Sequence, residues 1–392
     1  MKCVVVSYGS RGDTEPCAVV ARELLRRGHD VQVAVPPNLL GLVQSQGLAA
    51  VAYGPDSHGQ FDALPQFMAR MQNPYEALPD IVQHVTQIWA DKRAVLASLT
   101  DGADVLLTSM TEQRLAANIA EYQRIPLVAL HFFPARLQPA GLLHEQITKL
   151  AEDPQRRALG LPESTEPPQP LLEIQAYDDR CLPAPSSQWV EARADRPFVG
   201  ALTLELPADT DDEVLSWIAE GTPPIYFGLG STPISSPDET VGMVIAACAQ
   251  LNLRLLVCAG PNDFSHLEHF NHVKVVSAVN QSAIFPACGA IVHHGGAGTT
   301  AAALRAGVPM LILWLWLDQP VWAAAVEQLR VGAARPFSET TEQTLVADLR
   351  SILAPHYVAR ARDIAPQMIP PRESESLAAD FVEYAVQPER VS

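Results

Sequence analysis

The amino-acid sequence predicts a doubly wound α/β protein made of two domains, each built on a parallel sheet. Short apolar runs of strand length alternate with helical patterns over the first 131 residues, and a new alternation begins at Pro224. Strands that alternate with helices form βαβ units, and these units produce parallel sheets. A proline-rich stretch, Glu152–Pro197, separates the two alternations and reads as a long surface connection with a few short elements.

The composition supports a globular protein. The 392 residues suffice for two domains with cores of their own, and 48% of them are hydrophobic whereas 18% are charged. A net charge of −17 argues against a nucleic-acid partner and against attachment to anionic membranes by bulk charge. The six cysteines are scattered without a C-x-x-C pair, and the apolar N-terminal run is too short for a signal peptide. No apolar run approaches the ~18 residues of a membrane span. We therefore expect a soluble cytoplasmic protein.

The first half opens on a strand–loop–helix unit. Cys3–Ser7 has the pattern of a buried strand, Tyr8–Thr14 that of a loop, and the helix that follows closes at Gly28. We expect further strands near residues 31–35, 51–54, 105–108 and 127–131. Residues 55–100 look irregular until a helical pattern returns near Ile81–Leu99.

The second half repeats this alternation. We expect strands near residues 225–227, 255–259, 273–276, 290–292 and 310–313, and helices over 241–250, over 319–329 and twice after Thr344. The expected organisation is an N-terminal domain over 1–205, a linker over 206–222, a second domain over 223–370, and a C-terminal helix in 371–392 that crosses back to the first domain. Two such halves predict a cleft between them.

The stretch Ala290–Gly307, A-I-V-H-H-G-G-A-G-T-T-A-A-A-L-R-A-G, is the most informative in the chain. After the strand and His293 comes a turn of small residues, Gly295, Gly296, Ala297 and Gly298, and Thr299 and Thr300 then open a helix that Gly307 ends. The free N–H groups and positive dipole end of such a helix bind anions, and glycines let the backbone approach a phosphate. The other interpretation is tight packing between strand and helix, with the histidines at a surface turn.

Three more loops are expected at the same sheet edge. Gly230-Ser231-Thr232 offers hydroxyls, Asn280-Gln281 offers amides for a base or ribose, and Asp318-Gln319 offers paired hydrogen bonds to sugar hydroxyls. Ser231 and Asp318 can equally be helix caps. Together, the loops describe a site for a nucleoside diphosphate sugar.

The first half supplies a candidate base and an acceptor surface. Asp13 follows the first strand and is either a general base or an N-cap of the helix at Glu15. Arg11, beside Gly12, either neutralises phosphate or pairs with Asp13 or Glu15. His131-Phe132-Phe133 ends another strand, and its rings form either an acceptor wall or part of the core.

The motifs Y-G-S-R-G-D-T-E-P, H-H-G-G-A-G-T-T with A-G-V-P, and L-D-Q-P resemble those of bacterial glycosyltransferases that act on glycopeptides, sterols and mycobacterial glycopeptidolipids (family 1 and 28-like). This resemblance implies the GT-B fold of two Rossmann-like domains, and an inverting hexosyltransferase that uses a UDP- or dTDP-sugar without a metal or other cofactor. It implies that Asp13 deprotonates an acceptor hydroxyl.

The resemblance also assigns the donor site. It implies that Ser231, His293, Gly295, Gly296 and Thr299 hold the diphosphate, that Gln281 lies near the nucleoside, and that Asp318 and Gln319 hold the sugar. The complete set of predicted donor-binding residues is Arg11, Gly12, Ser231, Thr232, Asn280, Gln281, His293, Gly295, Gly296, Ala297, Gly298, Thr299, Asp318 and Gln319.

The acceptor is predicted from departures within those motifs. The run L-W-L-W-L-D-Q-P-V-W looks closer to the lipid- and sterol-directed members, so we expect an apolar or lipidic acceptor and peripheral contact with a membrane. The expected acceptor residues are His131, Phe132 and Phe133. The tryptophan usual in the loop before the glycine turn is absent, since Ala278 or Val279 stands there. UDP and dTDP therefore remain equal alternatives.

Two other functions share these features. A nucleotide-sugar epimerase has the same two-domain architecture, but it has no use for an acceptor surface such as 55–100 or Phe132-Phe133. A non-catalytic nucleotide-sugar binder would have no use for a base at Asp13.

Overall fold

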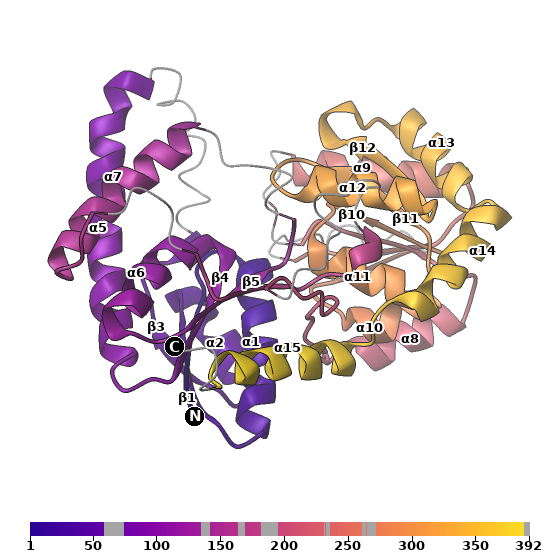
Figure 1. Cartoon of the computed structure of the whole chain (residues 1–392). Helices are drawn as coiled ribbons and strands as arrows, with labels where there is room; N and C mark the ends of the chain where they lie inside the picture. Colours follow the sequence, from indigo (N-terminus) through magenta and orange to yellow (C-terminus); the bar gives the residue numbers. More distant parts are fainter. Residues whose placement is uncertain are drawn as a thin grey trace. The chain divides into compact units, whose positions relative to one another are not determined.

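The computed structural model describes residues 1–58, 74–134, 142–163, 169–181, 195–230, 232, 236–260, 264 and 272–387 (side chains of 74–78 and 142–145 excepted). The chain divides into two compact units (Figure 1). The first unit comprises Met1–Ala176, Glu191–Leu202 and Pro371–Ser392, and the second comprises Tyr177–Val190 and Thr203–Pro370. None of the helices in the described ranges combines the length and the apolar character that a membrane crossing requires.

The first unit is built on a parallel sheet whose described strands have the order β3-β2-β1-β4-β5-β6. The strands are β1 (Lys2–Val6), β2 (Asp30–Val35), β3 (Ala49–Ala52), β4 (Val105–Ser109), β5 (Leu127–His131) and β6 (Leu172–Gln175). Its helices are α1 (Arg11–Arg26), α2 (Leu40–Gln44), α5 (Pro74–Leu99), α6 (Gln113–Gln123), α7 (Leu142–Ala158) and α15 (Pro371–Ala385), with a 3₁₀ turn η2 at Met110–Glu112.

The second unit repeats this topology in its described strands, with the order β12-β11-β10-β7-β8-β9 and all pairs parallel. The strands are β7 (Ile225–Gly228), β8 (Leu255–Cys258), β9 (Val273–Val276), β10 (Ala290–His293), β11 (Met310–Trp314) and β12 (Gly332–Pro336). The helices are α8 (Asp211–Ala219), α9 (Pro237–Gln250), α10 (Gln281–Ile284), α11 (Ala297–Ala306), α12 (Gln319–Leu329), α13 (Glu342–Ile352) and α14 (Pro355–Ile364). The predicted doubly wound α/β class is confirmed.

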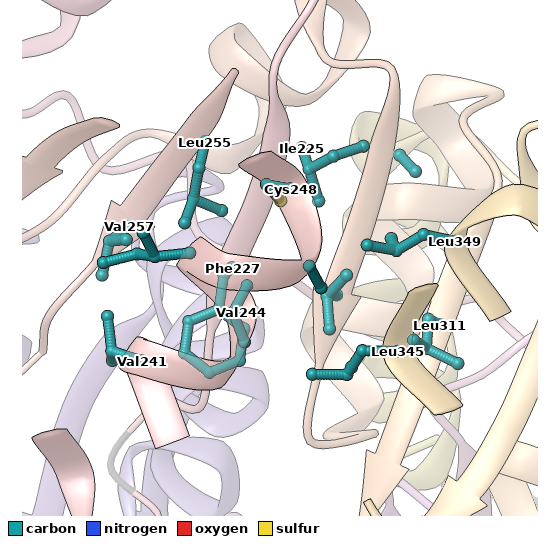
Figure 2. Close-up of a cluster of buried hydrophobic side chains, with 14 of the residues drawn as sticks. Ile225, Phe227, Val241, Val244, Cys248, Leu255, Val257, Leu311, Leu345 and Leu349 are labelled. Atoms are coloured by element: carbon teal, nitrogen blue, oxygen red, sulfur yellow. The ribbon is translucent and has the colours of Figure 1, made fainter. Parts of the chain in front are cut away.

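One apolar cluster of the second unit lies against one face of its sheet. Alternate residues of a strand point to the same face, which places Ile225 and Phe227 of β7 together. Figure 2 shows them with side chains from α9, β8, β11 and α13, all buried in one apolar cluster. This packing fixes the strand ends from which the functional loops leave.

The described residues of the proline-rich stretch 152–197 include the end of a helix and one strand. α7 continues to Ala158 despite Pro154, and β6 is an edge strand of the first sheet. β6 escaped prediction because it contains the polar residues Glu173 and Gln175, which are buried in the folded protein. The Glu173 carboxylate accepts a hydrogen bond from Arg196 at 2.8 Å.

Two further element predictions were wrong in part. β12 was not expected, because Gly332 was interpreted as a residue beyond the end of a helix. In the structure, a Cβ on Gly332 would lie 1.9 Å from the carbonyl oxygen of Met310. Glycine is required there because β12 packs closely on β11. The helix expected near Ile81–Leu99 is α5, which begins earlier, at Pro74, and residues 59–73 of the irregular stretch lie outside the described residues.

The last helix, α15, packs against α1 within the first unit (Figure 1). Arg27 of α1 bonds to Asp380 at 2.6 Å and Glu383 at 2.8 Å, and Arg22 pairs with Glu375 at 2.9 Å. The contact therefore joins residues more than 350 positions apart in the sequence.

Candidate active site

Each sheet has one position where the order of its strands reverses. In the first unit this position lies between β1 and β4, and in the second between β7 and β10. Ligands of open α/β sheets bind outside the carboxyl ends of the strands at such a reversal, because the loops there leave in opposite directions. The predicted site residues that follow β1, β7 and β10 lie at these two positions.

The glycine turn after β10 differs in one respect from the prediction. α11 begins at Ala297 with Gly296 as its N-cap, so Ala297 and Gly298 form the first helical turn rather than the preceding loop. The first N–H groups of any α-helix have no carbonyl partner within the helix. The amides of Ala297, Gly298 and Thr299 are these unpaired groups. Gly307 ends α11 in the left-handed region, as predicted, with φ of 67°.

Packing inside the protein accounts for both glycines of the turn. A Cβ on Gly295 would lie 2.8 Å from Cγ2 of Ile312, and φ there is +91°. A Cβ on Gly296 would lie 2.5 Å from Nε2 of His294. The sequence left close phosphate approach and tight packing as alternatives. The contacts show tight packing at both positions, and close approach of a phosphate stays a prediction.

His293 is fully buried at the end of β10. Its Nδ1 accepts a hydrogen bond from the Gly295 N–H at 3.1 Å. Burial, followed by the neighbouring His294, holds the pKa of His293 well below its ordinary value. The ring is therefore neutral, and since Nδ1 is an acceptor, Nε2 carries the proton. This Nε2–H group is buried and has no partner among the described residues.

The predicted nucleoside residues lie next to the turn. Gln281 Nε2 donates to Thr299 Oγ1 at 3.4 Å, so two predicted donor-binding residues are brought together. Asn280 begins α10, and its Oδ1 accepts from the Ser282 hydroxyl at 2.7 Å. Thr232 closes a turn on Leu229 after β7, with N–H to oxygen at 3.2 Å. Ser231 lies outside the described residues.

Asp318 and Gln319 begin α12. Asp318 occupies the N-cap position, where its Oδ2 accepts from the indole N–H of Trp322 at 2.8 Å, and burial raises its pKa. Gln319 Oε1 accepts from the backbone N–H groups of Leu315 at 2.7 Å and Trp316 at 3.2 Å. The side-chain oxygen of Gln319 therefore holds the preceding loop in place.

Trp322 is a residue that the site prediction missed. Its ring packs edge-on against Tyr177, with centroids 5.8 Å apart. The available signal was the i, i+4 spacing from Asp318 to Trp322, which places both side chains on one helix face.

In the first unit, Asp13 lies within α1 and not in a loop as expected. α1 begins at Arg11, so Asp13 is its third residue and the loop covers only residues 7–10. The Asp13 Oδ2 accepts hydrogen bonds from the Ser10 N–H at 2.7 Å and the Ser10 hydroxyl at 2.8 Å. Ser10 is the N-cap, and Asp13 is its capping-box partner.

The residues next to Asp13 contact the helix and the carboxylate in different ways. Arg11 forms an ion pair with Glu15 at 2.7 Å, which is one of the two pairings that the sequence left open. Gly12 is exposed in the first turn of α1. Gly9 has φ of +137°, and a Cβ there would lie 2.4 Å from the Asp13 Oδ2. Glycine at position 9 therefore makes room for the carboxylate.

A buried charged cluster, which the sequence did not reveal, supports the loop before α1. Lys92 of α5 pairs with Glu112 at 2.8 Å, and the same carboxylate accepts from the Tyr53 hydroxyl at 2.7 Å. The Lys92 ammonium lies 3.3 Å from the centroid of the Tyr8 ring. Burial lowers the pKa of Lys92, and Glu112 opposes this shift. No local motif predicts the cluster because its members come from four separate segments.

The three predicted acceptor residues end β5. His131 is buried, and its Nε2 lies 2.9 Å from the Gln113 Oε1. Phe132 and Phe133 are half-buried and meet edge-on, with ring centroids 5.6 Å apart. The structure thus places His131 in the core and leaves only the two phenylalanine rings partly accessible.

The two doubly wound sheets and the loops at their reversal points define the class as a two-domain enzyme of the GT-B fold. Residues 243–383 match the model of the "Erythromycin biosynthesis protein CIII-like, C-terminal domain" family. An uncharacterized glycosyltransferase of Mycobacterium tuberculosis is 51% identical, with 98% of this chain and 99% of that protein covered. The sterol 3-beta-glucosyltransferase of Arabidopsis thaliana is 25% identical, over 93% of this chain and 65% of that protein.

Solved structures share the fold. The glycosyltransferase VinC in complex with dTDP superposes with a TM-score of 0.69 at 20% identity, over 100% of this chain and 99% of that one. The chain belongs to the glycosyltransferase family that contains the M. tuberculosis protein, and it is a glycosyltransferase of the GT-B fold.

Proposed function

We propose that the chain transfers a hexose from a UDP- or dTDP-sugar to a hydroxyl group of an apolar acceptor, with inversion at the anomeric carbon and without a metal ion. The acceptor class is a lipid, a lipopeptide or another secondary metabolite. The observation that carries the proposal is the neutral Nε2–H of His293, which is buried and has no partner among the described residues. His293 ends β10, and the glycine turn after it leads into the N-terminus of α11.

The diphosphate binds at this helix N-terminus. The amides of Ala297, Gly298 and Thr299 and the positive end of the helix dipole favour an anion there. The Nε2–H of His293 adds a neutral donor. These groups stabilise the negative charge that grows on the leaving nucleoside diphosphate, and a single donor of this kind contributes about 3 kcal/mol to the barrier. Loss of His293 should therefore slow turnover roughly 100-fold.

The nucleoside and the sugar occupy the loops beside the turn. Gln281, which bonds to Thr299, is close enough to the diphosphate residues to contact the nucleoside. The Asp318 carboxylate binds sugar hydroxyls through Oδ1, because Trp322 bonds to Oδ2. The complex of VinC with dTDP supports a nucleoside diphosphate as the leaving group.

Asp13 is the proposed base. Its hydrogen bonds from Ser10 fix the carboxylate and leave it half-buried. The acceptor hydroxyl forms a bond to the anomeric carbon while its proton passes to Asp13. The bond from that carbon to the phosphate oxygen breaks, and the electron pair leaves with the nucleoside diphosphate.

An apolar acceptor is supported by the loop before α12. Leu317 is 66% exposed and has φ of +54°, an uncommon conformation for a large apolar residue. It immediately precedes Asp318, the proposed sugar ligand. The name of the Arabidopsis relative, a sterol glucosyltransferase, is in line with an apolar acceptor.

The test is release of nucleoside diphosphate from a panel of UDP- and dTDP-sugars, with and without a lipid extract, for wild type and Asp13→Asn. Release that requires both the extract and Asp13 is expected. Conversion of the donor sugar without an acceptor would indicate an epimerase. Donor binding without release in any mixture would indicate a binding protein, and both outcomes would overturn the proposal.

A further inference from the structure

His294 separates two of the loops at the reversal point of the second sheet. A Cβ on Gly230, after β7, would lie 3.1 Å from the His294 Cε1, and a Cβ on Gly296 would lie 2.5 Å from its Nε2. The same edge of the imidazole therefore contacts the backbone of both loops. Neither glycine leaves room for a larger residue beside the ring.

A third loop extends this packing. A Cβ on Gly260, after β8, would lie 2.8 Å from the carbonyl oxygen of Gly230. Gly230 and Gly260 also have φ of +61° and +60°, which favours glycine at both positions. Gly230 is thus confined between Gly260 and the His294 ring. Its distance from the N-terminus of α11 depends on the width of that ring.

The His294 ring acts through its volume and not through charge. Burial lowers its pKa to about 4, so the ring is neutral at physiological pH. Its Nδ1 is buried without a partner among the described residues. The contacts that the ring makes among the described residues are packing contacts: with the backbone of the two glycines, and edge-on with the His293 ring, at 6.1 Å between centroids.

We propose that His294 is a positioning residue that sets the separation between Gly230 and the N-terminus of α11, and so pre-forms the diphosphate site. This inference rests on the proposed function, since the diphosphate is assigned to that helix terminus. Without the ring, the loop after β7 moves relative to the amides of α11. A displacement of about 1 Å at such a site can cost up to 100-fold.

The test is a double-mutant cycle of wild type, His294→Ala, Gly296→Ala and the combined variant. Gly296 has φ of −64° and ψ of 142°, which alanine adopts without strain, so only the His294 ring opposes the new methyl group. Binding of UDP and dTDP is measured by calorimetry, and unfolding by urea. Gly242→Ala is the matched control, because a Cβ there meets nothing within 4 Å.

We expect each single variant to weaken nucleotide binding at least tenfold, and the combined variant to bind no worse than Gly296→Ala. If His294→Ala binds UDP and dTDP as wild type does but unfolds at a lower urea concentration, the ring contributes to stability alone. That result would overturn the inference. Independent effects in the combined variant would overturn it as well. His294→Asn repeats the cycle should His294→Ala not fold.

Failure of the proposed function and failure of this inference give different results in these measurements. Wild type that binds neither UDP nor dTDP contradicts the proposed donor. The urea cycle needs no ligand, and additive losses of stability in it contradict the coupling between His294 and Gly296.

Discussion

The Asp13 carboxylate accepts two hydrogen bonds from Ser10, one from its backbone N–H at 2.7 Å and one from its hydroxyl at 2.8 Å. Asp13 therefore completes the N-terminus of α1 whether or not it acts in catalysis. The sequence offered the cap and the base as alternatives. The two roles are compatible, because a carboxylate that caps a helix keeps the negative charge that a general base needs.

Asp13→Asn separates the roles. The amide oxygen still accepts from Ser10, so we expect a loss of stability below about 1 kcal/mol. The amide cannot take a proton, so turnover should fall at least 100-fold. Thermal unfolding and kcat are measured on the same preparation. Ser10→Ala is the counterpart: it should lower stability by about 1 kcal/mol and kcat much less than Asp13→Asn. Equal kcat in Asp13→Asn and wild type would leave Asp13 as a cap alone.

Gly9→Ala should impair activity through Asp13. The new methyl group would stand 2.4 Å from the carboxylate oxygen, at a backbone conformation with φ of +137°. We expect a fall in kcat of at least tenfold, because the carboxylate must move away from Ser10. Gly41→Ala on α2 serves as the control, since a Cβ there meets nothing within 4 Å. Unchanged kcat in Gly9→Ala would mean that the orientation of Asp13 is unimportant.

Trp322→Phe tests the sugar site. Phenylalanine keeps a ring against Tyr177 but removes the N–H that bonds to Asp318 at 2.8 Å. We expect the donor KM to rise several-fold with a smaller change in kcat. The pKa of Asp318, which burial already raises, should rise further because a bond that favours the carboxylate is lost. The acid limb of the donor kcat/KM profile should therefore move to higher pH, and an unmoved limb would argue against a role for Asp318.

Glu112→Ala should destabilise the first unit by about 3–5 kcal/mol, because it leaves the Lys92 ammonium buried without a counter-charge. The double variant Lys92→Met, Glu112→Ala should be more stable than Glu112→Ala, since no charge is then stranded. Urea unfolding of both variants measures the difference. A double variant less stable than Glu112→Ala would refute this account of the pair.

Acid should weaken the second unit through its buried histidines. The pKa of His294 lies at about 4 in the folded protein, below the ~6.5 of an unfolded histidine. The unfolded state then binds more protons between these values, so stability is complete above about pH 6.5 and falls as the pH drops towards 4. His294 accounts for on the order of 3 kcal/mol of this loss. Urea midpoints at pH 7.5 and 5 should differ less in His294→Asn than in wild type.

Periodicity predicted most of the strands because parallel strands are buried on both faces and read as apolar runs. β1, β4, β5, β7 and β10 were found for this reason. β6 and β12 were missed because they are edge strands with polar or small residues whose partners lie elsewhere in the chain. The α11 N-terminus was predicted two residues late, since glycine and alanine look like a turn.

The candidate site was predicted as a set of loops but not as a set of contacts. Local sequence pointed to Asp13, His293 and Asp318. It could not show that His294 fills the space beside Gly296, or that Trp322 bonds to Asp318, since these depend on which side chains meet after folding. The Lys92–Glu112 pair was inaccessible to sequence reasoning for the same reason.

The place of α15 has a consequence for biosynthesis. Arg27, near the start of the chain, finds its partners Asp380 and Glu383 only when the far end of the sequence has been made. During translation, residues 203–370 of the second unit emerge before the helix that completes the first. Until α15 has been synthesised, the face of α1 that packs against it is therefore uncovered. A ribosome that stalls before residue 371 leaves the first unit in that state.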